Sequence, residues 1–121
     1  PWGDEFDPNK ANTIETGLNT TGAVGCFPGG ASPHDVLDLS GNVWEWTRSL
    51  WGENFAEPDF KYPYNSKDGR EALDASDQVL RVLRGGSFIY NDRDARCAYR
   101  DWYYPDYWNR FYGFRVAASP F

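Results

Sequence analysis

Four residues in the first half of the chain could together hold a hard cation. Asp38 and Glu45 carry carboxylates, and Gly41 and Val43 lie between them, so two side chains and two backbone carbonyls fall within eight residues. Ligand sets made only of carboxylate and carbonyl oxygens suit Ca²⁺. The spacing therefore predicts a calcium site where a short helix gives way to a strand. Local hydrogen bonding within the turn is the alternative that the spacing leaves open.

The other reactive side chains do not form a catalytic pattern. The chain has one histidine, His34, and its two cysteines, Cys26 and Cys97, lie 71 positions apart. A zinc site needs three or four such ligands at short spacings, so none is predicted. A Ser-His-Asp site would depend on His34, and no serine is marked as activated. Carboxylate pairs for glycoside hydrolysis stay open, because 18 acidic residues give too many candidates.

A second group of residues indicates binding rather than catalysis. Seven of the twelve residues in 101–112 are aromatic, compared with 18% of the whole chain. Pro105 interrupts any helix in this range. Tyr and Trp give stiff, amphipathic contact area, and Asp and Asn add adaptable hydrogen bonds. We therefore expect an irregular surface segment with exposed rings, with burial of single rings in a core as the alternative.

Short elements must position these residues. The clearest strand is 77–84, which is apolar at four positions and ends at a Gly85-Gly86 turn. Ser32 as N-cap, Pro33 at the first helical position and an acidic first turn predict a short helix that ends near Gly41. The remaining expected elements are strands at 42–47 and 113–117, a short element at 96–100, and loops at 1–31 and 51–67.

The length, net charge and composition of the chain limit the class of protein. A chain of 121 residues can form one domain with a modest core. Its net charge of -6 makes a nucleic acid or an anionic membrane an unexpected partner. No apolar run approaches the roughly 20 residues of a membrane helix, and no signal peptide is recognisable. The first residue is Pro1, so the sequence is expected to begin within a longer protein, and it indicates no cellular compartment. The two cysteines could be bridged or free.

Five motifs follow one another along the chain: PWGD at 1–4, VLDLSGNVWEWT at 36–47, RVLRGGSF at 81–88, RCAYR at 96–100 and GFRV at 113–116. In this order they closely resemble the formylglycine-generating enzyme (sulfatase-modifying factor) family. The resemblance covers almost the whole chain. It implies the family's variant of the C-type lectin fold, an irregular α+β domain with short strands and few helices. Residues 1–121 would be the C-terminal part of a single such domain, and its N-terminal half would pack against them.

The resemblance extends to the calcium prediction. Family members bind calcium through positions equivalent to Asp38, Gly41, Val43 and Glu45, with the two middle positions supplying carbonyl oxygens. All four positions match, so a structural Ca²⁺ is implied. A second family site begins with an asparagine equivalent to Asn12, and its downstream aspartate has no clear counterpart in this chain.

The catalytic pattern of the family is not matched. The oxidase binds copper through two cysteines shortly after its Gly-Gly-Ser motif, whereas residues 88–95 of this chain contain no cysteine. Cys97 matches a different cysteine, which is structural in some relatives. Related sulfoxide synthases take their iron ligands from another domain that this sequence lacks. A non-catalytic chain without copper is therefore expected.

Another branch of the family, the variable proteins of diversity-generating retroelements, resembles this chain in its LRGGSF segment, a mutable stretch and a final GFRV. The resemblance implies a variable binding segment at about 88–112 in a fixed frame. The positions where variability is usual are Ile89, Tyr90, Asp92, Asp101, Trp102, Tyr103, Tyr104, Tyr107, Trp108, Phe111 and Tyr112.

The leading hypothesis is thus a non-catalytic ligand-binding domain. Its hypervariable, aromatic-rich surface would bind a protein or other macromolecule, with the aromatic side chains as hot spots. The alternative is an oxygen-dependent enzyme domain of the formylglycine-generating or sulfoxide-synthase type. A third hypothesis is a structural or regulatory domain of a larger protein.

Overall fold

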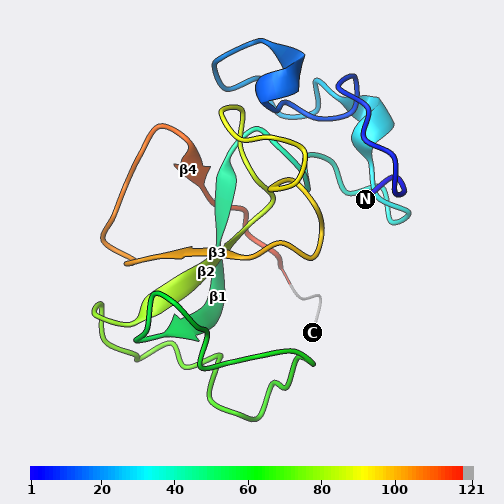
Figure 1. Ribbon diagram of the computed structural model, residues 1–121. Coiled ribbons are helices and arrows are strands. Elements are labelled where there is room, and N and C mark those ends of the chain that lie inside the picture. The colour runs from blue at the N-terminus through cyan, green and yellow to red at the C-terminus, as the bar shows by residue number, and fades with distance from the viewer. Residues whose placement is uncertain (119–121) are drawn as a thin grey trace.

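A four-stranded mixed sheet forms the centre of the computed structural model, which describes residues 1–118 (Figure 1). The strands lie in the order β3-β2-β1-β4. Strand β2 is antiparallel to both of its neighbours, whereas β4 is parallel to β1. The strands are β1 (Trp44–Gly52), β2 (Leu80–Arg84), β3 (Asp101–Tyr103) and β4 (Tyr112–Gly113).

The helices of the described residues are two short 3₁₀ turns, η1 (Ile14–Thr16) and η2 (Pro28–Gly30). The expectation of short strands, few helices and much irregular structure is therefore confirmed. No helix in residues 1–118 is long and apolar enough to cross a membrane.

Strands β1 and β2 contribute most of the buried apolar residues of the core, including the adjacent pairs Leu50–Trp51 and Val82–Leu83. Leu80 and Val82 of β2 are buried with Trp51 of β1 in one cluster. The pairing register shifts between Trp46 and Leu50, which marks an irregularity in β1. The Thr47 hydroxyl donates to the Val82 carbonyl at 2.9 Å there, so a side chain satisfies a carbonyl beside the irregularity.

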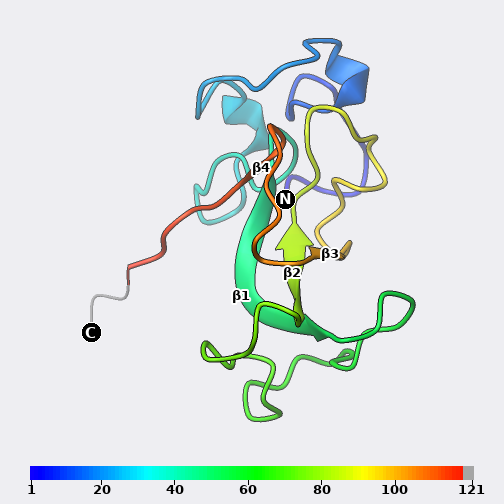
Figure 2. The ribbon, with the colours of Figure 1, turned by 90° about the vertical axis from the view of Figure 1, so that its left-hand side faces the viewer.

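Two groups of loops extend from the ends of the sheet. Residues 1–43 and the 85–100 loop gather at one end, and the 53–79 loop covers the other (Figures 1 and 2). The N-terminal loops are tied to the sheet through backbone bonds. The Asn42 N–H donates to the Asn12 carbonyl at 2.7 Å, and the Gly41 N–H donates to the Gly85 carbonyl at 2.7 Å.

The glycine at position 41 is required by this close approach. Its φ of 79° lies in the left-handed region, and a Cβ there would lie 2.5 Å from the Asn12 carbonyl oxygen. The Gly85-Gly86 turn expected at the end of β2 is also confirmed, since both glycines have positive φ.

The expected helix at 32–39 is wrong. The Ser32 hydroxyl accepts the His34 and Val36 N–H groups, as an N-cap would, yet the chain makes only a turn. Asp35 and Asp38 have φ of 59° and 54°, and this left-handed backbone cannot continue a helix. Val36 is exposed, so a helix here would have had little apolar face to bury.

Two expected strands are also displaced. Residues 96–100 are a turn and irregular chain, and the strand begins one residue later, as β3. At 113–117 only Gly113 is in a strand, and the rest of this range leaves the sheet (Figure 2). The apolar side chains of Phe114 and Val116 are 75% and 83% exposed, so in the described structure they have no core to bind.

Candidate functional site

The rings of the aromatic segment 101–112 divide into two packed groups and one largely exposed ring, that of Trp108. The first group faces the core. The Trp102 ring stacks on Trp51, with centroids 3.9 Å apart and planes 12° apart, and Tyr104 meets Phe55 edge-on at 5.5 Å. Trp102 and Tyr104 also pack against the buried cluster at the β1–β2 centre. The expectation that the segment simply displays its rings is wrong for these two residues.

The second group is a cluster of rings beside β4, here called the tyrosine cluster. Tyr103 stacks on Tyr107 at 3.9 Å, and Tyr107 lies 5.7 Å from Tyr112. Tyr112 also contacts Phe111 at 4.9 Å. On the other side, Tyr90 packs edge-on against Phe111 at 6.0 Å. The tyrosine cluster comprises Tyr90, Tyr99, Tyr103, Tyr107, Phe111 and Tyr112.

Trp44 connects the tyrosine cluster to the interior. Its ring is fully buried, and it contacts Tyr90 at 5.5 Å and Tyr99 at 5.8 Å. Trp44 of β1 therefore packs between the interior and the tyrosine cluster and helps to position Tyr90 and Tyr99.

Among the aromatic residues of the segment, only Tyr107 and Trp108 are exposed, at 38% and 86%. Tight turns cause this result, because the Tyr107 N–H donates to the Tyr104 carbonyl and the Tyr112 N–H donates to the Asn109 carbonyl. These turns fold most rings back on one another and leave Trp108 at the outer end. Of the remaining predicted positions, Asp92 is exposed, whereas Ile89 is half-buried.

Two carboxylates shape the electrostatics of the tyrosine cluster. Burial raises the pKa of Asp101, and the charge of Asp94 raises it further. Burial also raises the pKa of Tyr112, and the negative charge of Asp101 adds to the effect. The pKa values of Tyr90 and Tyr99 are raised by the same causes, burial first. The cluster therefore presents protonated phenols near acidic groups.

This coupling gives a testable pH dependence. Below the ordinary tyrosine pKa of 10 the phenols are protonated in both the folded and the unfolded chain. As the pH rises above 10, the unfolded chain loses these protons first, because the pKa values are raised only in the folded chain. The free energy of unfolding therefore falls. Absorbance titration at 295 nm should show late ionisation of Tyr90, Tyr99 and Tyr112. Asp101→Asn should lower these pKa values, because its charge raises all three.

Tyr64 is the internal control for this titration. Its pKa is raised by its hydrogen bond to Glu71, so Asp101→Asn should leave it unchanged. A titration curve that is identical in the wild type and Asp101→Asn would show that the carboxylate does not act on the cluster.

The four residues of the calcium prediction lie at the start of β1 and in the turn before it. An Asp38 carboxylate oxygen accepts the Gly25 N–H at 2.8 Å. The two Glu45 oxygens accept from Arg115, from Nε at 2.7 Å and Nη2 at 2.5 Å. The Arg115 guanidinium also donates to the carbonyls of Leu37 and Asp38. Arg115 therefore supplies the positive charge next to Glu45. The hydrogen bonds with Glu45 in turn raise the pKa of Arg115.

The fit of these residues to a cation is partial. The donor set contains only oxygen atoms, which suits Ca²⁺, but a calcium ion would have to share Glu45 with Arg115. No group of three or more His, Cys, Asp or Glu side chains in residues 1–118 could hold a metal ion. The ion pair of Arg115 was not predicted, because Arg115 falls in an expected strand; its position between the apolar Phe114 and Val116 was the available signal.

Asn12 is a second oxygen donor near this region. Its side chain is buried, its Nδ2 donates to the Thr20 carbonyl at 2.9 Å, and its Oδ1 has no hydrogen-bond partner in the described structure. A buried, unpartnered oxygen is unusual and calls for an explanation such as a water or an ion.

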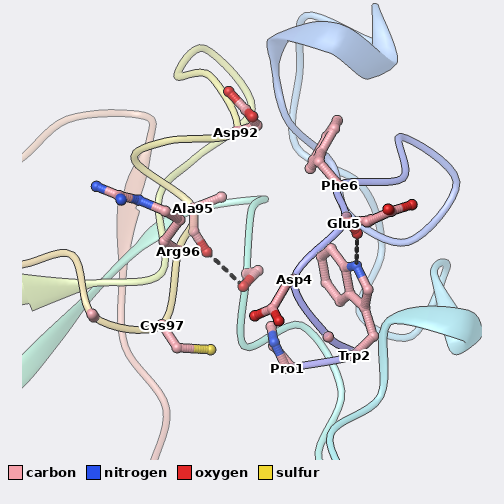
Figure 3. Close-up of a pocket in the computed structure, with 12 residues that line it drawn as sticks. Pro1, Trp2, Asp4, Glu5, Phe6, Asp92, Ala95, Arg96 and Cys97 are labelled. Atoms are coloured by element: carbon pink, nitrogen blue, oxygen red, sulfur yellow. Dashed lines mark hydrogen bonds between the residues drawn. The ribbon is translucent and has the colours of Figure 1, made fainter.

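A cavity of about 510 Å³ opens between the N-terminal segment 1–6 and the 92–98 loop (Figure 3). The Ser40 hydroxyl donates to the Ala95 carbonyl at 2.8 Å at its base. Cys97 lines the cavity as a free thiol, and Cys26 is also free. The cavity therefore contains one thiol, and its charged lining residues are Asp4, Glu5, Asp92 and Arg96.

The comparisons with known proteins identify the relationship. The sequence profile of the sulfatase-modifying factor enzyme 1-like domain matches residues 1–120. The chain belongs to this family. The solved structure of PvdO from Pseudomonas aeruginosa superimposes with a TM-score of 0.62 at 26% identity, and the match covers 93% of this chain and 40% of PvdO. The formylglycine-generating enzyme type of fold is thereby shown.

Relatives within the family are named for different activities. The chain is 33% identical to the serine/threonine-protein kinase pkn1 of Chlamydia caviae, over 98% of this chain and 18% of the kinase. It is 31% identical to the inactive C-alpha-formylglycine-generating enzyme 2 of Bos taurus and 28% identical to the formylglycine-generating enzyme of Mus musculus. It spans 37% and 33% of those two proteins, so membership does not decide catalysis.

Proposed function

We propose that the chain is a non-catalytic ligand-binding domain whose segment 88–112 displays a diversified surface, as in the variable proteins of diversity-generating retroelements. The observation that carries the proposal is the lack of cysteine in residues 88–95, where the family's oxidase has its copper-binding pair. The exposed Trp108 and Tyr107 support it, since they offer amphipathic contact area on a packed aromatic base. The fold would be the family's C-type lectin variant, and the ligand a protein or other macromolecule.

Sequencing of the locus tests diversification directly. We expect a near-copy of the coding stretch for residues 84–116 that differs only at adenines, next to a reverse-transcriptase gene. The differing codons would define the variable positions. Without such a copy the aromatic surface is a fixed one, and the retroelement part of the proposal fails.

An oxygen-dependent enzyme is the second candidate, and the cavity at Cys97 is the observation that favours it. We expect the purified protein to take up no oxygen with copper or iron, because a single thiol cannot replace the pair. Metal-dependent oxygen uptake that is lost in Cys97→Ser would overturn the non-catalytic assignment.

We also propose a structural Ca²⁺ held by Asp38, Glu45 and the carbonyls of Gly41 and Val43. The match of all four positions to the family pattern and the oxygen-only donors support it. Removing the ion should lower the melting temperature, because a ligand that binds only the folded state stabilises it. Thermal unfolding with and without a calcium chelator should differ by several degrees in the wild type and not in Asp38→Ala. No shift in the wild type would rule the site out.

The exposed Phe114 and Val116 suit packing against the N-terminal half of the same domain. The relatives are much longer than this chain, which supports a further part of the domain beside it. Co-expression with that half should bury both side chains, and a Phe114→Asp variant should recover less of the complex than the wild type.

A further inference from the structure

A pocket of about 220 Å³ is lined by residues of β1 and β2, of the 60–71 loop and by Arg100. None of the predicted variable positions and none of the predicted calcium ligands lines it. Its lining combines three guanidinium groups with hydroxyl groups and two apolar residues. The guanidinium groups belong to Arg70, Arg84 and Arg100.

Arg84 and Arg100 are held at this pocket by neutral groups. Arg84 donates to the Tyr62 hydroxyl at 3.0 Å and to the Cys97 carbonyl. Arg100 donates to the Phe60 carbonyl at 2.9 Å, and its guanidinium lies over the Trp51 and Tyr62 rings at 4.9 and 5.1 Å. Carbonyls and ring faces orient both side chains without neutralising them.

The charges around the pocket do not balance. Arg70 is paired with Asp68 at 2.7 Å. Glu71 accepts hydrogen bonds from Ser49 and Tyr64, which line the pocket, and is paired with Arg48 at 2.7 Å. Neither Arg84 nor Arg100 forms an ion pair with a carboxylate in residues 1–118. Burial lowers the pKa of Arg100, and the charges of Arg70 and Arg84 lower it further. Two half-buried positive charges thus share one pocket in a protein of net charge -6.

We propose that this pocket binds a small oxyanion dianion of the phosphate or sulfate type, held between the guanidinium groups of Arg84 and Arg100. A dianion balances the two unpaired charges, whereas a single carboxylate leaves one of them unpaired. Planar guanidinium forks suit the oxygens of such an ion, because they donate parallel hydrogen bonds. The pocket is smaller than the roughly 300 Å³ at which drug-sized ligand sites begin, which favours a small ion or the end group of a small ester.

The first test is an NMR titration of the full chain at pH 7.5 with inorganic phosphate and with sulfate, which is a dianion at this pH. The signals to follow are the Nε–H groups of Arg84 and Arg100 and the indole N–H of Trp51. We expect saturable shifts with phosphate and with sulfate, and only small shifts with acetate at equal ionic strength. Equal shifts with acetate, or shifts that never saturate, would overturn the proposal.

Glycerol 3-phosphate distinguishes the two sources of the ion. Tighter binding than inorganic phosphate indicates the end group of a phosphate ester, and weaker binding indicates the free ion. Both results keep the dianion site, whereas no binding of either compound removes it.

Substitutions of the two pocket arginines test whether phosphate binds at this pocket. Arg100→Lys keeps the charge and loses the fork, so it should weaken phosphate binding about tenfold, the effect of one charge-assisted hydrogen bond. Arg93→Lys is the matched control, since Arg93 is exposed and does not line the pocket. Arg84→Gln serves as the second pocket variant where Arg100→Lys does not fold. Wild-type affinity in the folded pocket variants would contradict the assignment.

Discussion

Replacing Trp102 by alanine is expected to lower the free energy of unfolding by about 3 kcal/mol, near the lower end of the range for tryptophan truncation because the ring is only partly buried. The ring stacks on Trp51 at 3.9 Å and packs on the cluster of Leu80 and Val82. Removing the Trp102 ring takes away the packing that shields these core residues from water. Urea denaturation followed by fluorescence would measure the loss, with Trp51 and the other tryptophans as reporters.

Trp108→Ala is the matched control within the same segment. Its ring is 86% exposed, so the change in unfolding free energy should stay within about 0.5 kcal/mol. If the proposed binding surface is correct, Trp108→Ala should remain folded and lose affinity for the partner. Similar destabilisation by the two variants would show instead that the whole segment serves the fold, which is the third hypothesis.

Replacing Gly41 by alanine is expected to cost about 2–5 kcal/mol. A left-handed backbone disfavours alanine by about 1–2 kcal/mol. The added Cβ would also lie 2.5 Å from the Asn12 carbonyl, and overpacking of this kind adds about 1–3 kcal/mol. The Asn12 loop would have to move, together with its hydrogen bond to Asn42. Chemical denaturation of the variant would measure the total.

Gly17→Ala separates the two causes. Gly17 has a φ of 76°, close to the 79° of Gly41, but a Cβ there meets nothing within 4 Å. Its cost should therefore be the backbone effect alone, about 1–2 kcal/mol. An equal loss in the two variants would mean that the approach of Asn12 to Gly41 has no energetic consequence.

The strands that could be predicted are those whose sequence alone defines a buried face. The apolar run of β2 and the aromatic run of β1 have this property, and β1 begins two residues and β2 three residues after the predicted start. The 32–39 range shows the limit, because its capping chemistry is real but a helix also needs an apolar face in contact with a core. Nothing local to Ser32 or Pro33 reports that such a contact is missing.

The aromatic segment shows a second limit. Its composition correctly suggested that its rings would not fill one core, yet it did not reveal that Trp102 and Tyr103 would pack in different groups. Alternation along β3 separates their side chains, and that short strand is defined by its pairing with β2, which sequence does not show. The pocket at Arg84 and Arg100 was missed for the same reason, since three arginines far apart in sequence meet only in the folded chain.

The positions of β3 and β4 limit how the segment between them can evolve. These strands lie at opposite edges of the sheet, so residues 104–111 must cross three strand spacings, roughly 14 Å in total (Figure 1). Fully extended, eight residues would reach roughly 27 Å, so the crossing uses about half of the available length. Side-chain identity at its outer end can change freely, whereas deletions of more than about three residues would pull one edge strand out of register. Natural variants of this chain should therefore differ in residue type along the crossing far more than in its length.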